Sequence, residues 1–221
     1  MVLLGGFLEV TKRFGQDIDV FEIGASAGLN LAFDKYYYQA DGWHWGNPNS
    51  QVRFKPIWEG SPPPLGPIRV HRRKACDISP VSAATEKNRL LSYVWPDQFE
   101  RLNRIRGAID LIAKANFMIG AMEATDWLGL QNDNSPGTRP RVFYHSIIWQ
   151  YFTEEQKTSF NAAIEMIGGK ASLSSPVIWM RLEPDRNRQN AELKMTIWPS
   201  QTEYVLAVSG FHGEWVKWFG V

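Results

Sequence analysis

A glycine-containing segment near the amino end has the residue types of a ligand-binding turn. It reads E-I-G-A-S-A-G-L-N from Glu22 onward and lies between an apolar run and a stretch with helical spacing. Gly24 and Gly28 allow a tight turn and a close approach to a ligand around Ala25 and Ser26. The helix expected after them would offer free N–H groups to an anion. Glu22, at the end of the strand, could contact a cationic or hydroxyl group held over the turn.

The same letters also fit the G-x-S-x-G turn of serine hydrolases, with Ser26 as the nucleophile. Asp185 and His212 would then supply the acid and the base. In α/β-hydrolases, however, several strands precede that turn, whereas at most one helix and one strand precede it here. A dinucleotide-binding turn would have a glycine where Leu29 stands. The pattern E-x-G-x-x-x-G is more similar to the first motif of S-adenosylmethionine-dependent methyltransferases, in which a glycine is usual at the position of Ser26.

A second acid follows the next predicted strand, in the segment A-C-D-I-S-P that contains Asp77 and Ile78. It resembles the methyltransferase segment whose acid holds the ribose hydroxyls of the cofactor, chemistry that a carboxylate also performs on the ribose of NAD. Asp77 lies further from Gly24 than the ~20 residues of a compact unit, and an insertion over residues 36–66 accounts for the excess. The alternative is that Asp77 forms a turn, since Asp-x-Ser-Pro is a turn signal.

Two further candidates follow the third and fourth predicted strands. Glu123 and Ala124 occupy the place of the acid-small pair that lines the adenine in methyltransferases, while Asp126 is more typical of a helix cap. His145 titrates near neutral pH, and we expect it at the carboxyl edge of the sheet, where it could take a proton from an acceptor. A structural hydrogen bond is its other interpretation. Weaker candidates for the same pocket are Gln150, Tyr151 and Glu183.

The elements that position these residues alternate between helix and strand. The hydrophobic spacing predicts helices over 2–14, 29–36 and 154–167, and buried strands over 18–24, 117–122 and 142–149. A strand with one solvated side is expected over 68–77, followed by two helical stretches. The second of these has Asp97 and Glu100 spaced as a capping box and a buried stripe that begins at Phe99. Another capping box, Thr153 with Gln156, begins the helix that Gly168 and Gly169 end.

The carboxyl-terminal part has a different pattern. Strands are predicted over 177–184, 191–199 and 203–210, with little room for a helix between the last two, so they are expected to be antiparallel. The fold class is therefore α/β, with a mostly parallel Rossmann-like sheet flanked by helices and closed by antiparallel strands. We predict one domain over residues 1–221, with residues 36–66 as an inserted hairpin or flap.

Composition excludes several classes of protein. The 221 residues carry 24 Lys and Arg against 23 Asp and Glu, so no basic excess points to a nucleic-acid partner. The single cysteine, Cys76, excludes an internal disulfide and a four-thiolate metal site. No apolar run approaches the ~18 residues of a membrane span, and the start lacks the features of a signal peptide. A reducing cytoplasm is the expected location. Composition does not indicate an oligomeric state.

Several segments together resemble a bacterial family known as domain of unknown function 2332. They are E-I-G-A-S-A-G-L-N-L, the W-G and W-E-G stretches, A-C-D-I-S-P, L-L-S-Y-V-W-P-D-Q, Y-H-S-I-I-W-Q-Y and M-R-L-E-P. The resemblance covers nearly the whole chain and implies a methyltransferase-type core without an assigned activity. Asp-Ala is usual in the family where Glu123 and Ala124 stand. Its members are longer, with an additional helical amino-terminal region, so part of a lid is expected to be absent from this chain.

Three functions follow from these motifs and their order along the chain. The leading one is binding of S-adenosylmethionine and transfer of its methyl group to a small or unknown acceptor, in which Gly24 to Gly28 hold the amino-acid end of the cofactor. The competing one is a non-catalytic module of the same fold that binds a nucleotide or a partner chain. Serine hydrolysis through Ser26 comes third.

Overall fold

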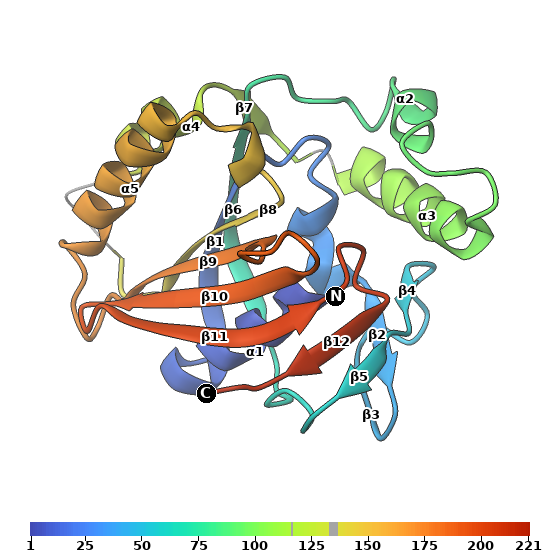
Figure 1. The fold of residues 1–221 in the computed structure, drawn as a ribbon, viewed down its shortest axis with the longest axis horizontal. Coiled ribbons are helices and arrows are strands. Elements are labelled where there is room, and N and C mark those ends of the chain that lie inside the picture. Colours follow the sequence, from blue (N-terminus) through green and yellow to red (C-terminus); the bar gives the residue numbers. More distant parts are fainter. Residues whose placement is uncertain (116, 133–136) are drawn as a thin grey trace.

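A nine-stranded sheet with helices on both faces forms the protein (Figure 1). The computed structural model describes residues 1–115, 117–132 and 137–221. Its helices are α1 (Val2–Phe14), α2 (Lys87–Leu91), α3 (Phe99–Ala115), α4 (Ala124–Gln131) and α5 (Glu154–Gly168), with short 3-10 helices η1 (Leu29–Lys35) and η2 (Trp149–Tyr151). Among these described residues, no helix is long and apolar enough to cross a membrane.

Five parallel strands make up one side of the sheet. They are β1 (Asp17–Ile23), β6 (Arg69–Asp77), β7 (Ile119–Ala121), β8 (Arg141–Ser146) and β9 (Val177–Pro184), and they lie in the order β7-β6-β1-β8-β9. Each neighbouring pair is parallel. The strand order reverses between β1 and β8. In open α/β sheets of this kind, ligands bind beyond the carboxyl ends of the strands at such a reversal.

Alternation along β1 divides the core between the two faces of the sheet. Ile18 and Val20 contribute to a cluster with α1, η1 and α3, whereas Phe21 and Ile23 contribute to a second cluster with α4 and α5. Figure 1 shows α4 and α5 together on one side of the sheet and α3 on the other. Both faces are covered, and six of the seven residues of β1 are buried, the acids Asp19 and Glu22 included.

The carboxyl-terminal strands close the sheet in antiparallel order, as predicted. They are β10 (Ala191–Trp198), β11 (Thr202–Ser209) and β12 (Trp215–Trp218). The predicted insertion contains the hairpin β2 (Tyr37–Ala40) and β3 (Trp43–Gly46), and β4 (Arg53–Phe54) joins it in a small sheet. Its last strand, β5 (Ile57–Glu59), instead pairs with β12 at the edge of the large sheet.

The helix predicted over residues 29–36 is wrong in type. The chain forms the 3-10 helix η1, which is kinked at Ala32. Side chains occupy the carbonyl groups that an α-helix would bond internally: the Tyr36 hydroxyl donates to the Leu29 carbonyl, and the Arg73 guanidinium donates to the Leu31 carbonyl. These tertiary hydrogen bonds favour the shorter and tighter helix.

Three other predictions need correction. The buried strand over 117–122 is the short edge strand β7, and Met118 beside it is 84% exposed. An edge strand has a neighbour on one side only, so its apolar letters do not imply burial. Helix α3 begins at Phe99, one residue later than an N-cap at Asp97 requires, and Phe99 itself is exposed. The strand over 142–149 ends at Ser146, because Ile147 adopts a positive φ of 55°. The capping box of Thr153 and Gln156 is confirmed.

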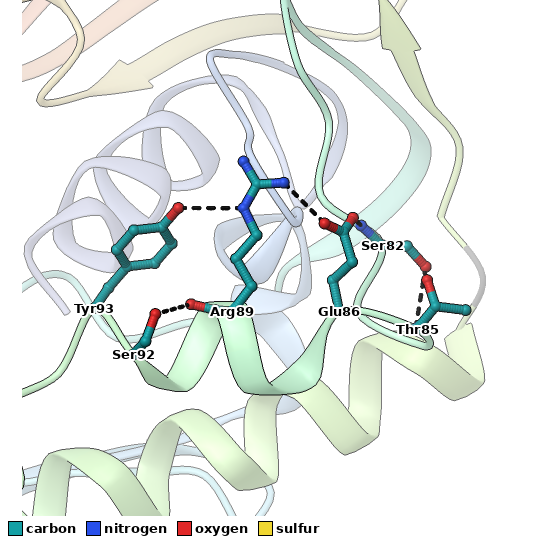
Figure 2. A network of polar contacts seen from close by, with 6 residues as sticks. All are labelled: Ser82, Thr85, Glu86, Arg89, Ser92 and Tyr93. Atoms are coloured by element: carbon teal, nitrogen blue, oxygen red, sulfur yellow. Dashed lines mark hydrogen bonds and ion pairs between the residues drawn. The ribbon is translucent and has the colours of Figure 1, made fainter.

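Local polar contacts stabilise the segment that connects β6 to α3 (Figure 2). The Glu86 carboxylate accepts a hydrogen bond from the Ser82 amide and pairs with Arg89, whose guanidinium also donates to the Tyr93 hydroxyl. Thr85 and Ser92 add further contacts at the two ends of α2. The chain that leaves the sheet at Asp77 is therefore ordered by its own short-range bonds before it enters α3.

Candidate functional site

A pocket of about 510 Å³ lies at the carboxyl ends of the parallel strands, where the strand order reverses. This volume is within the range of small-molecule sites, ~300–1,000 Å³. Its lining comes from the ends of β1, β6, β7 and β8 and from the start of α5. The lining residues are Ile23, Gly24, Ser26, Cys76, Asp77, Ile78, Met122, Glu123, Ala124, Ser146, Ile147, Ile148, Tyr151, Phe152 and Gln156. Six of the predicted cofactor-binding residues therefore meet in one pocket.

Four backbone amides of the glycine segment are already bonded within the protein. The amides of Gly24 and Ala25 both donate to the Cys76 carbonyl, and the amide of Gly28 donates to the Ala25 carbonyl. The Ser26 amide donates to Asp77 Oδ2 at 2.7 Å. These four amides are occupied, and the helix is the seven-residue 3-10 segment η1, so this geometry does not support the expectation that the turn and a following helix hold an anion.

Gly24 is required by both its backbone and its surroundings. Its φ is +70°, which side-chain-bearing residues rarely adopt, and a Cβ there would lie 2.5 Å from Cγ2 of Ile148. The connection after β8 thus packs directly on the turn after β1. Gly28 also has a positive φ, of 72°, but it lies outside the pocket lining, as does the buried Ala25.

Asp77 connects three elements at the pocket. Its Oδ2 accepts from the Ser26 amide of the first turn, and its Oδ1 accepts from the Ser79 amide at 2.8 Å, which is the turn-forming bond that the sequence offered as an alternative. Its carbonyl accepts from Met122 after β7. Each carboxylate oxygen retains a second lone pair, so Asp77 can accept hydrogen bonds from a ligand while it orders the two turns.

Glu123 is the N-cap of α4, the role that the sequence suggested for Asp126. Its Oε2 accepts from the amides of Thr125 and Asp126 at 2.6 and 3.2 Å. Both bonds go to one oxygen, Oε2, and Glu123 and Ala124 both line the pocket. Asp126 lies in the first turn of the helix, outside the lining.

Glu22 lies beneath the turn and outside the pocket lining. It is 2% exposed, and its carboxyl group is bonded to the Asn30 amide and the Tyr144 hydroxyl on the α1 face of the sheet. Burial raises the pKa of Glu22 to about 8, and the nearby Asp77 charge adds to this effect. Because the ionised form is disfavoured there, Glu22 is mostly protonated at neutral pH.

We expect stability to fall with rising pH through Glu22. The folded protein retains this proton up to about pH 8, whereas an ordinary glutamate loses it near 4.5, so the favourable contribution is complete below pH 4.5 and is lost as pH rises through 8. Glu22→Gln should flatten the pH dependence of the unfolding free energy, by about 5 kcal/mol between pH 4 and pH 9. Denaturant unfolding at several pH values measures it. An unchanged slope in the variant would contradict the assignment.

His145 is fully buried and does not line the pocket. Its Nδ1 lies 2.7 Å from Oε1 of Glu183, and its ring stacks on Trp149 and contacts Phe160 and Trp179. Burial lowers its pKa, although the hydrogen bond to Glu183 acts in the opposite direction. A neutral imidazole with no exposed surface has no access to an acceptor in the pocket, so the predicted proton transfer by His145 has no support in the geometry.

Glu183 contributes more to the site than its sequence position suggests. Its carboxylate accepts from the amides of Ile148 and Trp149 at 3.0 and 3.1 Å, in addition to the bond from His145. These bonds fix the connection after β8 that forms one wall of the pocket. The sequence shows only that Glu183 is an acid near the end of a strand. The amides that it bonds lie 34 and 35 residues earlier in the chain, so the sequence did not reveal this role.

The groups required for serine hydrolysis do not meet at Ser26. Among the described residues, no histidine lines the pocket; His212 lies in other clefts beside Arg101, while Asp185 is bonded in the turn after β9. Cys76 lines the pocket, but burial raises the pKa of its thiol to about 12, so it stays protonated. Within residues 1–115, 117–132 and 137–221, no group of three or more potential metal ligands occurs. The hydrolase hypothesis therefore lacks a histidine that could act as the base for Ser26.

These features define an α/β protein with a pocket of about 510 Å³ at the reversal point of a mostly parallel sheet. The family of uncharacterised proteins conserved in bacteria, DUF2332, matches residues 1–218, and the chain belongs to it. The family membership that the sequence motifs predicted is thus confirmed. No curated protein and no solved structure matches the chain.

Proposed function

We propose that the pocket binds S-adenosylmethionine and that the protein transfers its methyl group to a small molecule. The charge of the pocket carries this proposal. Its charged side chains are the carboxylates of Asp77 and Glu123, and no Lys, Arg or His of the described part of the chain lines it. S-adenosylmethionine suits such a pocket, because its sulfonium and ammonium groups outweigh its single carboxylate and leave it with a net positive charge. The phosphates of a dinucleotide or of ATP do not, because like charges repel and four amides of the glycine turn, those of Gly24, Ala25, Ser26 and Gly28, are already bonded.

The residues present fit this cofactor. The outer lone pairs of Asp77 are suited to the two ribose hydroxyls, and Glu123 Oε1 with Ala124 is suited to the adenine. The turn at Gly24 and Ser26 then faces the amino-acid end. The bound group would supply a methyl group activated by a positive sulfur, and the chain would supply alignment of the two reactants. The five-strand order β7-β6-β1-β8-β9 corresponds to the first five positions of the doubly wound order 3-2-1-4-5-6, which binds nucleotides at its reversal point.

Calorimetric titration tests the proposal directly. We expect S-adenosylhomocysteine and S-adenosylmethionine to bind with micromolar dissociation constants, and NAD and ATP to bind at least 100-fold more weakly, since each brings phosphates toward Asp77 and Glu123. Absence of heat with S-adenosylhomocysteine from folded protein, or tighter binding of ATP, would refute it.

One observation favours the non-catalytic alternative. The lining that the described residues form offers no imidazole or amino group, and His145 is buried, so these residues supply no strong general base to an acceptor. Binding of S-adenosylhomocysteine is common to both functions. Transfer of a labelled methyl group to small-molecule fractions distinguishes them, because only a methyltransferase releases labelled product.

A further inference from the structure

The two sides of the pocket differ in chemistry. The ends of β1, β6 and β7 contribute both carboxylates and the glycine turn. The connection from β8 to α5, which the structure describes in full, contributes no charged side chain to the lining. Its lining residues are Ser146, Ile147, Ile148, Tyr151, Phe152 and Gln156. We name this group the apolar wall.

We propose that the apolar wall is a second subsite that binds an uncharged compound with a planar apolar ring. Tyr151 carries this inference, since its side chain lines the pocket and is 76% exposed. Large aromatic surface left open to water inside a pocket is surface that a ligand can cover, and rings of this kind favour stacked or edge-to-face partners. Ile78, from the other side of the same lining, is 78% exposed.

The wall is held in place before any ligand arrives. Glu183 bonds the amides of Ile148 and Trp149, and Trp149 packs on the buried rings of His145 and Phe160. Thr153 and Gln156 begin α5 with a reciprocal capping box. A rigid wall loses little conformational entropy on binding, which favours a flat, rigid ligand.

Neutral polar groups limit the class of ligand further. Ser146 offers a hydroxyl, and the side-chain oxygen of Gln156 accepts from the Thr153 amide, so its NH₂ group is directed away from that bond. A ring with one neutral polar substituent matches these groups. A carboxylate or phosphate on the ring would face Asp77 and Glu123 without a cation from the described lining to balance it.

If the subsite holds the methyl acceptor, that role rests on the proposed function. Its ability to bind an apolar ring does not depend on the proposed function and is tested separately. The probe is 2-naphthol, followed by its fluorescence, with 2-naphthoate as the charged match. We expect 2-naphthol to bind at least tenfold more tightly than 2-naphthoate. Tyr151→Ala should lower the affinity for 2-naphthol about tenfold, because it removes one good aromatic contact.

Tyr93→Ala is the matched control, because Tyr93 is 63% exposed and lies beside α2 outside the pocket. It should leave 2-naphthol binding unchanged. Equal affinity for both probes, or equal binding by Tyr151→Ala and the unmodified protein, would overturn the proposal. Melting temperatures of both variants verify that they fold.

A second arm separates this inference from the proposed function. With S-adenosylhomocysteine bound, 2-naphthol should still bind, since the two ligands use different sides of the pocket. Mutual displacement would overturn the second subsite and leave cofactor binding intact. Failure of S-adenosylhomocysteine to bind, together with binding of 2-naphthol that depends on Tyr151, would refute the proposed function and support the apolar subsite.

Discussion

Replacing Glu183 with alanine is expected to lower the melting temperature by roughly 10 °C, from a loss of about 3–5 kcal/mol. The carboxylate is 12% exposed and accepts three hydrogen bonds, from His145 and from the amides of Ile148 and Trp149. Its removal leaves these donors without an acceptor in a mostly buried place, and each such donor costs about 1–3 kcal/mol.

Glu183→Gln should lose less, because its oxygen replaces Oε1 and only the NH₂ group opposes the Trp149 amide. Glu192→Ala is the control, since Glu192 lies directly across from Glu183 in the strand register and pairs at the surface with Lys194. Differential scanning calorimetry of the three variants measures the effect. A melting temperature of Glu183→Ala within about 1 °C of the unmodified protein would show that these bonds do not hold the wall.

The meeting of Gly24, Asp77 and Glu123 could be predicted from the sequence. Each follows a run that has the pattern of a parallel strand, and the carboxyl ends of parallel strands share one edge of a sheet. Local rules also placed the start and end of α5, since the capping box of Thr153 and Gln156 lies within four residues.

What could not be predicted depends on partners that are distant in the chain. Residues 29–35 form a 3-10 helix because Arg73, more than thirty residues away, bonds the Leu31 carbonyl. His145 is buried because the connection after β8 folds back over it, and Glu183 from the next strand fixes that connection. The motif at Gly24 resembled an anion-binding site because an amino-acid sequence does not show which backbone amides are already hydrogen-bonded within the protein.

Glu22 and Ser26, four residues apart, have different roles because Glu22 lies within β1 and Ser26 lies in the turn that follows it. Glu22 points to the α1 face and is enclosed with Asn30 and Tyr144, whereas Ser26 belongs to the turn that emerges at the pocket. The sequence motif places Glu22 and Ser26 together near the end of β1. Only the direction of each side chain decides which of them can contact a ligand.

Replacing Asp77 with alanine is expected to lower the affinity for S-adenosylhomocysteine about 100-fold. Two contributions combine: the loss of charge-assisted hydrogen bonds to a ligand hydroxyl, about 1.5–3 kcal/mol, and the loss of the acceptor that orders the Ser26 and Ser79 amides. Asp77→Asn retains the shape but presents an NH₂ group to one of those amides, so it should bind with intermediate affinity. Calorimetric titration provides the dissociation constants.

Asp126→Ala provides the matched control for Asp77, because Asp126 is an acid beside the pocket that does not line it. The affinity of this variant for S-adenosylhomocysteine should stay within about twofold of that of the unmodified protein, since solvent largely screens an exposed charge outside the pocket. If Asp77→Ala is folded and binds as tightly as Asp126→Ala, the carboxylate only forms a turn, and the observation on which the proposed function depends is lost. If it alone loses binding, the acid that joins the ends of β1, β6 and β7 also holds the ligand.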